Sequence, residues 1–282
     1  MGLALEILVV TLLTVAVVVA VALLVRHLWR ERRAPHVAPP ERRGLPIVLA
    51  HGVLGFDEMR VGGRQVVYFR GVAEYLQDMG AEVHRPRVPP VASVAVRAQR
   101  LAAYIRDLPG PVNIVAHSLG GLDARYAIAR LGLDDRVASL TTVGTPHRGT
   151  PLADHAALLD RLKLHRLLGL FGLDVEAFFD MSREQVRKLN LLVPDVEEVT
   201  YLSVVGVAPA AGQIHPLLVP SHRYLADRAG PNDGLVPRDS QVWGEVVGEV
   251  QADHFAQVGW SRHFNATRLY GDLLRELRDR GL

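Results

Sequence analysis

The segment from Val112 to Gly121, VNIVAHSLGG, constrains the fold of this chain more than any other. It begins as an apolar run with the length of a buried strand and ends in glycines that are typical of a sharp turn into a helix. Ser118 stands at that turn, with the small residues Ala116 and Gly120 two positions before and after it. Small residues there let strand and helix approach closely and expose the serine hydroxyl. The pattern predicts a nucleophilic Ser118, with the Leu119 amide directed at a developing oxyanion.

Two further regions supply the other groups that such a serine needs. Residues 45–57, LPIVLAHGVLGFD, are an apolar strand that runs into a glycine-containing loop, where Val53 would offer a second backbone amide. The turn Asn232-Asp233-Gly234 carries a carboxylate 115 residues after Ser118, and His254 follows 21 residues later. Serine, aspartate and histidine in this order are one of the known arrangements of a catalytic triad.

Other acidic and basic residues compete for these roles. Asp227, Asp239 and Asp253 are alternative triad acids, although the side chain of Asp253 would diverge from that of its neighbour His254. His51 and His117 lie beside the proposed oxyanion loop and nucleophile, and we expect both to be structural. The remaining histidines show no metal-ligand spacing, and no phosphate-binding loop is present, so no cofactor is expected.

At these motifs the chain resembles the bacterial triacylglycerol lipases of the Pseudomonas and Burkholderia type, together with related esterases. The resemblance covers residues 45–270 and includes two more stretches, TVGTPHRGT at 142–150 and NDGLVP at 232–237. It implies an α/β-hydrolase fold that cleaves carboxylic esters, such as lipid or acylglycerol esters. It also implies the residue roles, which are Ser118 as nucleophile, Asp233 as orienting acid, His254 as general base, and Val53 and Leu119 as oxyanion-hole amides.

The chain departs from that family at its calcium site. In the family a calcium ion braces the histidine loop through an aspartate two positions after the histidine and another one upstream. Here Ala256 occupies the first position, and residues 213–220 contain no carboxylate. An apolar methyl group cannot bind a hard cation, so we expect no metal. The family's disulfide is impossible because the chain has no cysteine.

The first 25 residues differ from the rest of the chain. From Leu3 to Val25 the only charge is Glu6, and this apolar stretch of 23 residues exceeds the ~20 that span a bilayer as a helix. No basic residue precedes Arg26, which favours an uncleaved membrane anchor over a signal peptide. The expected organisation is therefore an anchor at 1–25, a proline-containing linker at 26–44 and a hydrolase domain at 45–282.

Charge gives an expected orientation for the anchor. Residues 26–43 carry six arginines and two glutamates, a net charge of +4, whereas residues 44–282 carry 26 basic and 27 acidic side chains, a net charge of −1. A basic flank is typical of the cytoplasmic side, so the hydrolase domain is expected to face the cytoplasm; export is the alternative, because the family's enzymes are exported. A nearly neutral domain gives no indication of nucleic-acid binding.

Beyond the first strand, helical and strand patterns alternate as in a doubly wound, mostly parallel sheet. Strands are expected at Ala81–His84, 112–116, Val137–Val143, Tyr201–Val207 and Val246–Val250. Helices are expected at Phe69–Met79, Val94–Asp107, Leu119–Leu131 and Arg262–Arg280.

The alternation stops at about 151–198, where leucine and phenylalanine dominate and Ser182 and Gln185 form a helix-capping pattern. We expect a helical cap over the active site there, either as plain helical packing or as an apolar wall for an acyl chain. Two other functions stay open at this point. An acyltransferase would use the same triad, and a catalytically silent, membrane-tethered binding module would use none of it. Acyl-chain length, protein partners and oligomeric state are not predicted.

Overall fold

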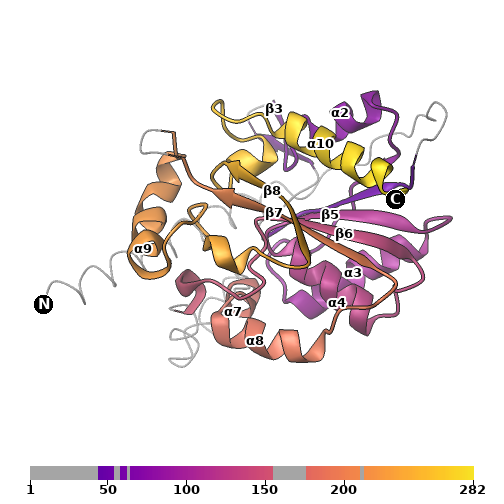
Figure 1. Cartoon of the computed structure of the whole chain (residues 1–282), viewed down its shortest axis with the longest axis horizontal. Helices are drawn as coiled ribbons and strands as arrows, with labels where there is room; N and C mark the ends of the chain where they lie inside the picture. The colour runs from indigo at the N-terminus through magenta and orange to yellow at the C-terminus, as the bar shows by residue number, and fades with distance from the viewer. Residues whose placement is uncertain (1–43, 54–57, 62–63, 155–175, 210–212) are drawn as a thin grey trace, which may run out of the picture.

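The computed structural model describes residues 44–53, 58–61, 64–154, 176–209 and 213–282 of the 282-residue chain. Its centre is a parallel six-stranded sheet in the order β4-β1-β5-β6-β7-β8 (Figure 1). The six strands are β1 (Ile47–Ala50), β4 (Val83–His84), β5 (Val112–His117), β6 (Val137–Val143), β7 (Thr200–Val207) and β8 (Glu245–Gln251). A separate antiparallel pair consists of β2 (Glu58–Val61) and β3 (Arg64–Val67).

Helices cover both faces of the sheet. Successive side chains of a strand point to opposite faces, and both faces are apolar here, so each face must be covered. Ile47 and Leu49 of β1 pack in one apolar cluster, and Val48 and Ala50 pack in another on the opposite face. Figure 1 shows the helices of the first cluster above the sheet and those of the second below it. The helices are α2 (Val72–Asp78) and α10 (Ala266–Asp279) in the first cluster, with α3 (Val94–Arg106) and α4 (Gly120–Arg130) in the second.

The last helix illustrates how the sequence specifies this packing. Its main buried residues are spaced by three and four positions, which places them in one stripe facing the sheet. They are Ala266, Leu269, Tyr270, Leu273, Leu274 and Leu277. Each fully buried leucine contributes about 1.5–3 kcal/mol relative to an exposed one, so this stripe holds α10 against the sheet.

The expected strands and helices are present, with shifted ends. The helix expected from Phe69 begins at Val72, because Gly71 has a left-handed backbone with φ 71°. The helix expected from Arg262 begins at Ala266, where the side chain of Asn265 caps it by accepting a hydrogen bond from the Arg268 amide. The sequence analysis did not anticipate β2, β3 or the helix α9 (Val219–Ala229).

The strand order determines where a ligand can bind. From β1 the chain passes to β4 at the sheet edge and then returns to β5 on the other side of β1. The connections that leave β1 and β5 therefore diverge, and such a switch point at the carboxyl ends of parallel strands is the usual ligand site of this architecture. Ala50 and Ala116 are paired neighbours on β1 and β5, so the residues after them, Val53 and Ser118, lie on adjacent loops.

The expected cap is partly described. Of residues 151–198, the structure describes 151–154 and 176–198, including α7 (Glu176–Asp180) and α8 (Arg183–Leu192). Ser182 caps α8 as its capping pattern predicts, by accepting a hydrogen bond from the Gln185 amide. Among the described helices, none combines the length and the apolar character that a bilayer span requires. The expected anchor, Leu3–Val25, lies outside the described residues.

Candidate active site

Ser118 is held in a strained backbone conformation at the turn between β5 and α4. Its φ of 57° makes it the only described residue other than glycine with a positive φ, a conformation that costs an L-residue about 1–2 kcal/mol. Two hydrogen bonds hold it, one from its amide to the Val143 carbonyl (3.0 Å) and one from Thr145 Oγ1 to its own carbonyl (2.8 Å). Gly120 is required because a Cβ there would lie 2.5 Å from the Ala50 carbonyl oxygen.

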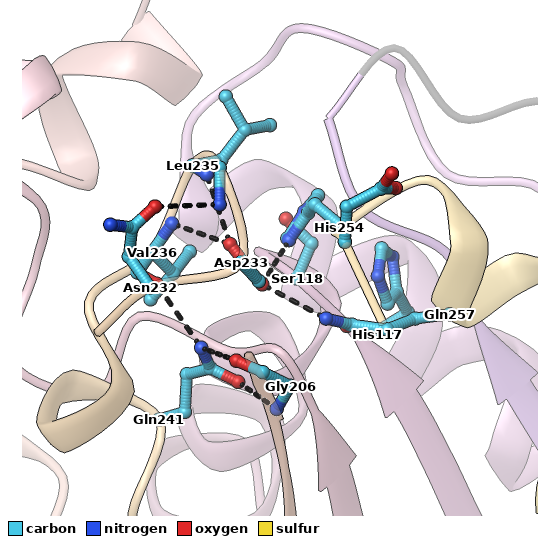
Figure 2. Close-up of polar contacts among 12 residues, drawn as sticks. His117, Ser118, Gly206, Asn232, Asp233, Leu235, Val236, Gln241, His254 and Gln257 are labelled. Carbon is cyan, nitrogen blue, oxygen red and sulfur yellow. Dashed lines mark hydrogen bonds and ion pairs between the residues drawn. The ribbon is translucent and has the colours of Figure 1, made fainter. Parts of the chain in front are cut away.

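Asp233 and His254 are joined at two points. His254 Nδ1 lies 2.7 Å from Asp233 Oδ2, and the His254 amide donates to the Asp233 carbonyl oxygen at 2.8 Å (Figure 2). Asp233 follows β7 by way of α9, and His254 comes directly after β8. Both side chains are buried. Since an ionised carboxylate only accepts, Nδ1 carries the proton and Nε2 is left as the base.

The turn around Asp233 orients its carboxylate. Oδ1 accepts hydrogen bonds from the amides of Leu235 (2.9 Å) and Val236 (2.7 Å). Asn232 fixes the turn from the other side, since its Oδ1 accepts from the Gly234 amide and its Nδ2 donates to the Gly230 carbonyl. The Asn-Asp-Gly turn therefore fixes the Asp233 carboxylate so that one of its oxygens faces His254.

The other three candidate acids are placed elsewhere. Asp227 and Asp239 are exposed, and Asp239 pairs with Arg238. Asp253 is buried, but its carboxylate accepts hydrogen bonds from the backbone amides of Phe255, Ala256 and His215. Of these aspartates, Asp233 alone contacts the His254 imidazole.

Ser118 lies beside the imidazole of His254 (Figure 2), but no hydrogen bond joins the two side chains. Such bonds are often long without substrate and tighten when it binds. Val53 and Leu119 lie on the loops after β1 and β5, and neither amide donates a hydrogen bond to another described residue.

A buried arginine connects the loop that follows β1 to the helix that follows the serine. Arg97 of α3 donates through Nη2 to the carbonyls of His51 (2.7 Å) and Gly52 (3.2 Å), and through Nε to Asp123 of α4 (2.8 Å). Burial raises the pKa of Asp123 to about 7, although Arg97 acts to lower it. Three charge-assisted bonds from one rigid guanidinium thus fix the loop before Val53 relative to α4.

Two histidines beside the site are buried and neutral. Burial, and then the positive charge of Arg97, lower the pKa of His51 to about 3. Burial and the neighbouring His254 lower the pKa of His117 well below its usual value. His117 Nδ1 lies 2.7 Å from the hydroxyl of Tyr68, which also accepts the Gly52 amide at 3.2 Å. Tyr68 therefore links the loop that follows β1 to the residue before Ser118.

Buried neutral histidines make stability depend on pH. His51, His117 and His147 all have lowered pKa values, chiefly through burial. Below pH 6.5 the unfolded chain binds three protons that the folded chain excludes, while Asp123 holds one proton only in the folded state. The net difference of two protons predicts that the unfolding free energy falls by about 3 kcal/mol per pH unit between pH 6 and 5.

Denaturant titrations at pH 7, 6 and 5 measure this slope. His147→Gln should reduce this slope by the contribution of about one proton. Replacement of the exposed His263 by glutamine should leave the slope unchanged. A free energy that stays constant or rises on acidification would contradict the assignment of three neutral histidines.

The residues do not fit the calcium ion of the family that the sequence resembles. Ala256 is buried where that family has an aspartate, and within the described ranges no three His, Asp or Glu residues cluster so as to hold a metal. Asp253 makes the corresponding connection by hydrogen bonds. It joins the histidine loop, through the Ala256 amide (2.8 Å), to the upstream segment, through the His215 amide (2.8 Å).

Sequence reasoning missed three supporting residues, Tyr68, Arg97 and Asp253. Arg97 could have been found, because it interrupts the apolar stripe of the helix expected at Val94–Asp107 with a charge. A charge in such a stripe indicates a buried ion pair. Tyr68 and Asp253 carry no comparable signal, since their partners are backbone amides and a distant histidine.

No family model matches the chain, but individual relatives do. Triacylglycerol lipase 2 of Saccharomyces cerevisiae is 31% identical over 209 residues, which are 70% of this chain and 63% of the yeast protein. A triacylglycerol lipase of Vibrio cholerae is 30% identical over 240 residues, which are 72% of this chain and 75% of that enzyme.

The lipase BlEst2 of Bacillus licheniformis has a similar solved structure, with a TM-score of 0.66 at 21% identity, covering 87% of this chain and 96% of that one. At this identity the likeness concerns the fold alone, and it confirms the expected α/β-hydrolase fold. The sequence relatives confirm the resemblance to bacterial triacylglycerol lipases. The chain therefore belongs to the triacylglycerol lipase family of carboxylic ester hydrolases.

Proposed function

We propose that the protein hydrolyses lipid or acylglycerol esters through an acyl-enzyme formed on Ser118. His254 Nε2 takes the hydroxyl proton as Ser118 attacks the ester carbonyl, and Asp233 holds the imidazole tautomer and balances the charge that forms. The amides of Val53 and Leu119 donate to the oxyanion of the tetrahedral intermediate. The protonated His254 then gives its proton to the leaving alcohol, and water repeats the sequence on the acyl-enzyme.

One observation carries this proposal. Asp233 and His254 are bonded through both side chain and backbone, directly beside a serine whose backbone has the strained φ of 57°. Strain of this kind persists where the surrounding structure enforces it, and it is characteristic of functional sites. The substrate class is supported by the relatives, since the yeast and Vibrio proteins are triacylglycerol lipases.

A panel of p-nitrophenyl esters from acetate to palmitate tests the function on the full-length protein in detergent. We expect hydrolysis of all chain lengths with the highest kcat/KM for the longer acyl groups. Product analysis with and without glycerol identifies the acceptor, and free fatty acid should dominate in both. Exclusive release of glycerol esters would show an acyltransferase, and absence of turnover would contradict the proposal.

Chelation tests the hydrogen-bonded linkage at Asp253. Because the Asp253 carboxylate joins the two segments by accepting hydrogen bonds from their amides, EDTA should change neither the activity nor the melting temperature. Asp253→Asn removes the acceptor for one amide, and it should lower the unfolding free energy by about 1–3 kcal/mol. A loss of activity on chelation that calcium restores would contradict this prediction.

The membrane attachment of the enzyme is the remaining part of the proposal. It is supported by the apolar 23-residue stretch from Leu3 to Val25 and by the six arginines after it, which favour a cytoplasmic hydrolase domain. Membrane fractions should retain the full-length chain after carbonate extraction. In intact cells and spheroplasts the C-terminus should resist external protease. A trimmed, soluble product in the medium would contradict the anchor.

A further inference from the structure

The carboxylate of Asp233 accepts a further hydrogen bond that the mechanism above does not use. Gln257 Nε2 lies 3.0 Å from Asp233 Oδ2, the oxygen that also accepts from His254 Nδ1 (Figure 2). Both Asp233 and Gln257 are completely buried. A carboxylate can only accept, so the NH₂ group of Gln257 must face Asp233, and this contact fixes the orientation of the amide.

Two glycines leave a narrow space, here called the slot, that the Gln257 amide fills. Gln257 lies three residues after His254, in the short 3-10 turn Ala256–Val258. Its side chain fits between Gly144, at the end of β6, and Gly206 of β7. A Cβ at either glycine would overlap the Gln257 amide. Only glycine at both positions leaves room for the side chain, and the slot in turn limits the rotamers that Gln257 can adopt.

The other end of the amide points toward His117. His117 Nδ1 lies 2.7 Å from the Tyr68 hydroxyl, and Nε2 is the other ring nitrogen. His117 Nε2 and Gln257 Oε1 are both buried, and neither has a hydrogen-bond partner among the described residues. The two side chains lie next to each other (Figure 2).

We propose that Gln257 is a positioning residue that orients the Asp233 carboxylate and, through it, the imidazole of His254. The proposal rests on the triad proposed above. The Leu235 and Val236 amides hold Oδ1, and Gln257 donates to Oδ2, which also accepts from His254 Nδ1. With donors on both oxygens the carboxylate cannot rotate, and the remaining lone pair of Oδ2 stays directed at His254 Nδ1.

Gln257→Met tests this role, because methionine has a similar length and fills the slot without a donor. Gln257 is completely buried and bonds the carboxylate of Asp233, so the change should act on the chemical step rather than on substrate binding. We expect kcat to fall by about 10- to 100-fold, as is typical for partners that orient a directly acting group. KM should stay within about two-fold of its original value.

Gln241→Met is the matched control. Gln241 is equally buried and exchanges two hydrogen bonds with the backbone of Gly206, with a third to the Val236 carbonyl. Its replacement removes at least as many buried hydrogen bonds but leaves the Asp233 carboxylate untouched. We expect both variants to lower the melting temperature. Gln241 bonds the Val236 carbonyl in the Asp233 turn but not the Asp233 carboxylate, so kcat of the folded enzyme should fall much less in Gln241→Met than in Gln257→Met.

Gln257→Glu adds a signature that a purely structural residue would not give. A protonated carboxyl group can donate to Asp233 as the amide does, whereas an ionised one repels it. The variant should therefore keep most of the original kcat near pH 6 and lose it progressively toward pH 9. A residue that only filled space would give a pH profile parallel to that of the unchanged enzyme.

The outcomes separate this proposal from the triad itself. Asp233→Asn is measured in the same assay, and if it is nearly silent, the triad is wrong. If Asp233→Asn is crippling while Gln257→Met keeps kcat within two-fold, the positioning role alone is overturned. Should Gln257→Met not fold, the Gln257→Glu profile decides, and a profile parallel to the original enzyme would overturn the proposal.

Discussion

Replacing Ser118 with alanine is expected to lower kcat for ester hydrolysis by about 10⁶-fold, the size of effect seen when other serine hydrolases lose the nucleophile. Without the hydroxyl no acyl-enzyme can form, and His254 and Asp233 have no proton to move. The fold should persist, because the bonds that hold residue 118 in its strained conformation involve its amide and carbonyl.

Steady-state kinetics and labelling with a fluorophosphonate measure this loss together. The original enzyme should take up one equivalent of probe on the peptide that contains Ser118, and the variant should take up none. Ser221→Ala is the control, because Ser221 of α9 is also buried but donates its hydroxyl proton to the Leu218 carbonyl, away from the triad. A folded Ser118→Ala protein that keeps most of its activity would show that another residue is the nucleophile.

Asp233→Asn is expected to cost about 10⁴-fold in kcat, the effect of the corresponding change in a serine protease. The asparagine retains the turn, because its oxygen can still accept the Leu235 and Val236 amides. Its NH₂ group then faces His254 Nδ1, which favours the tautomer protonated on Nε2. That tautomer cannot accept the proton of Ser118.

Asp227→Asn and Asp239→Asn provide the controls, because both carboxylates are exposed and neither contacts the imidazole. We expect both to stay within about two-fold of the original kcat. If Asp233→Asn were nearly silent and one of these two were crippling, Asp233 would not be the acid. The turn would then have only a structural role.

The alternating strands and helices, and the motifs formed by residues close together in the chain, could be predicted from the sequence. The strand, turn and helix around Ser118 can be inferred because apolar periodicity and small residues act over a few positions. The contact between Asp233 and His254 was inferred from chain order and family resemblance, since 21 residues separate them. The structure brings them together through the positions of β7 and β8 in the sheet.

The supporting contacts could not be predicted in the same way. Gln257 acts only because Gly144 and Gly206, on two other strands, leave space for it. The Asp253 linkage depends on a backbone amide 38 residues away. Such contacts depend on where distant segments meet in three dimensions. Neither the spacing of residues along the chain nor the composition predicts where they meet. The family resemblance selected Asp233 from its three competitors, and spacing along the chain alone did not.

The strand order also bears on self-association, because a sheet ends in two strands whose outer backbone groups could pair with another chain. At one end β4 is only two residues long, which offers little for a second strand to bind. At the other end β8 carries Glu245 and Glu249, held by ion pairs with Arg280 and Arg238. Two copies brought edge to edge along β8 would place like charges together, so this margin resists the strand pairing from which aggregates grow.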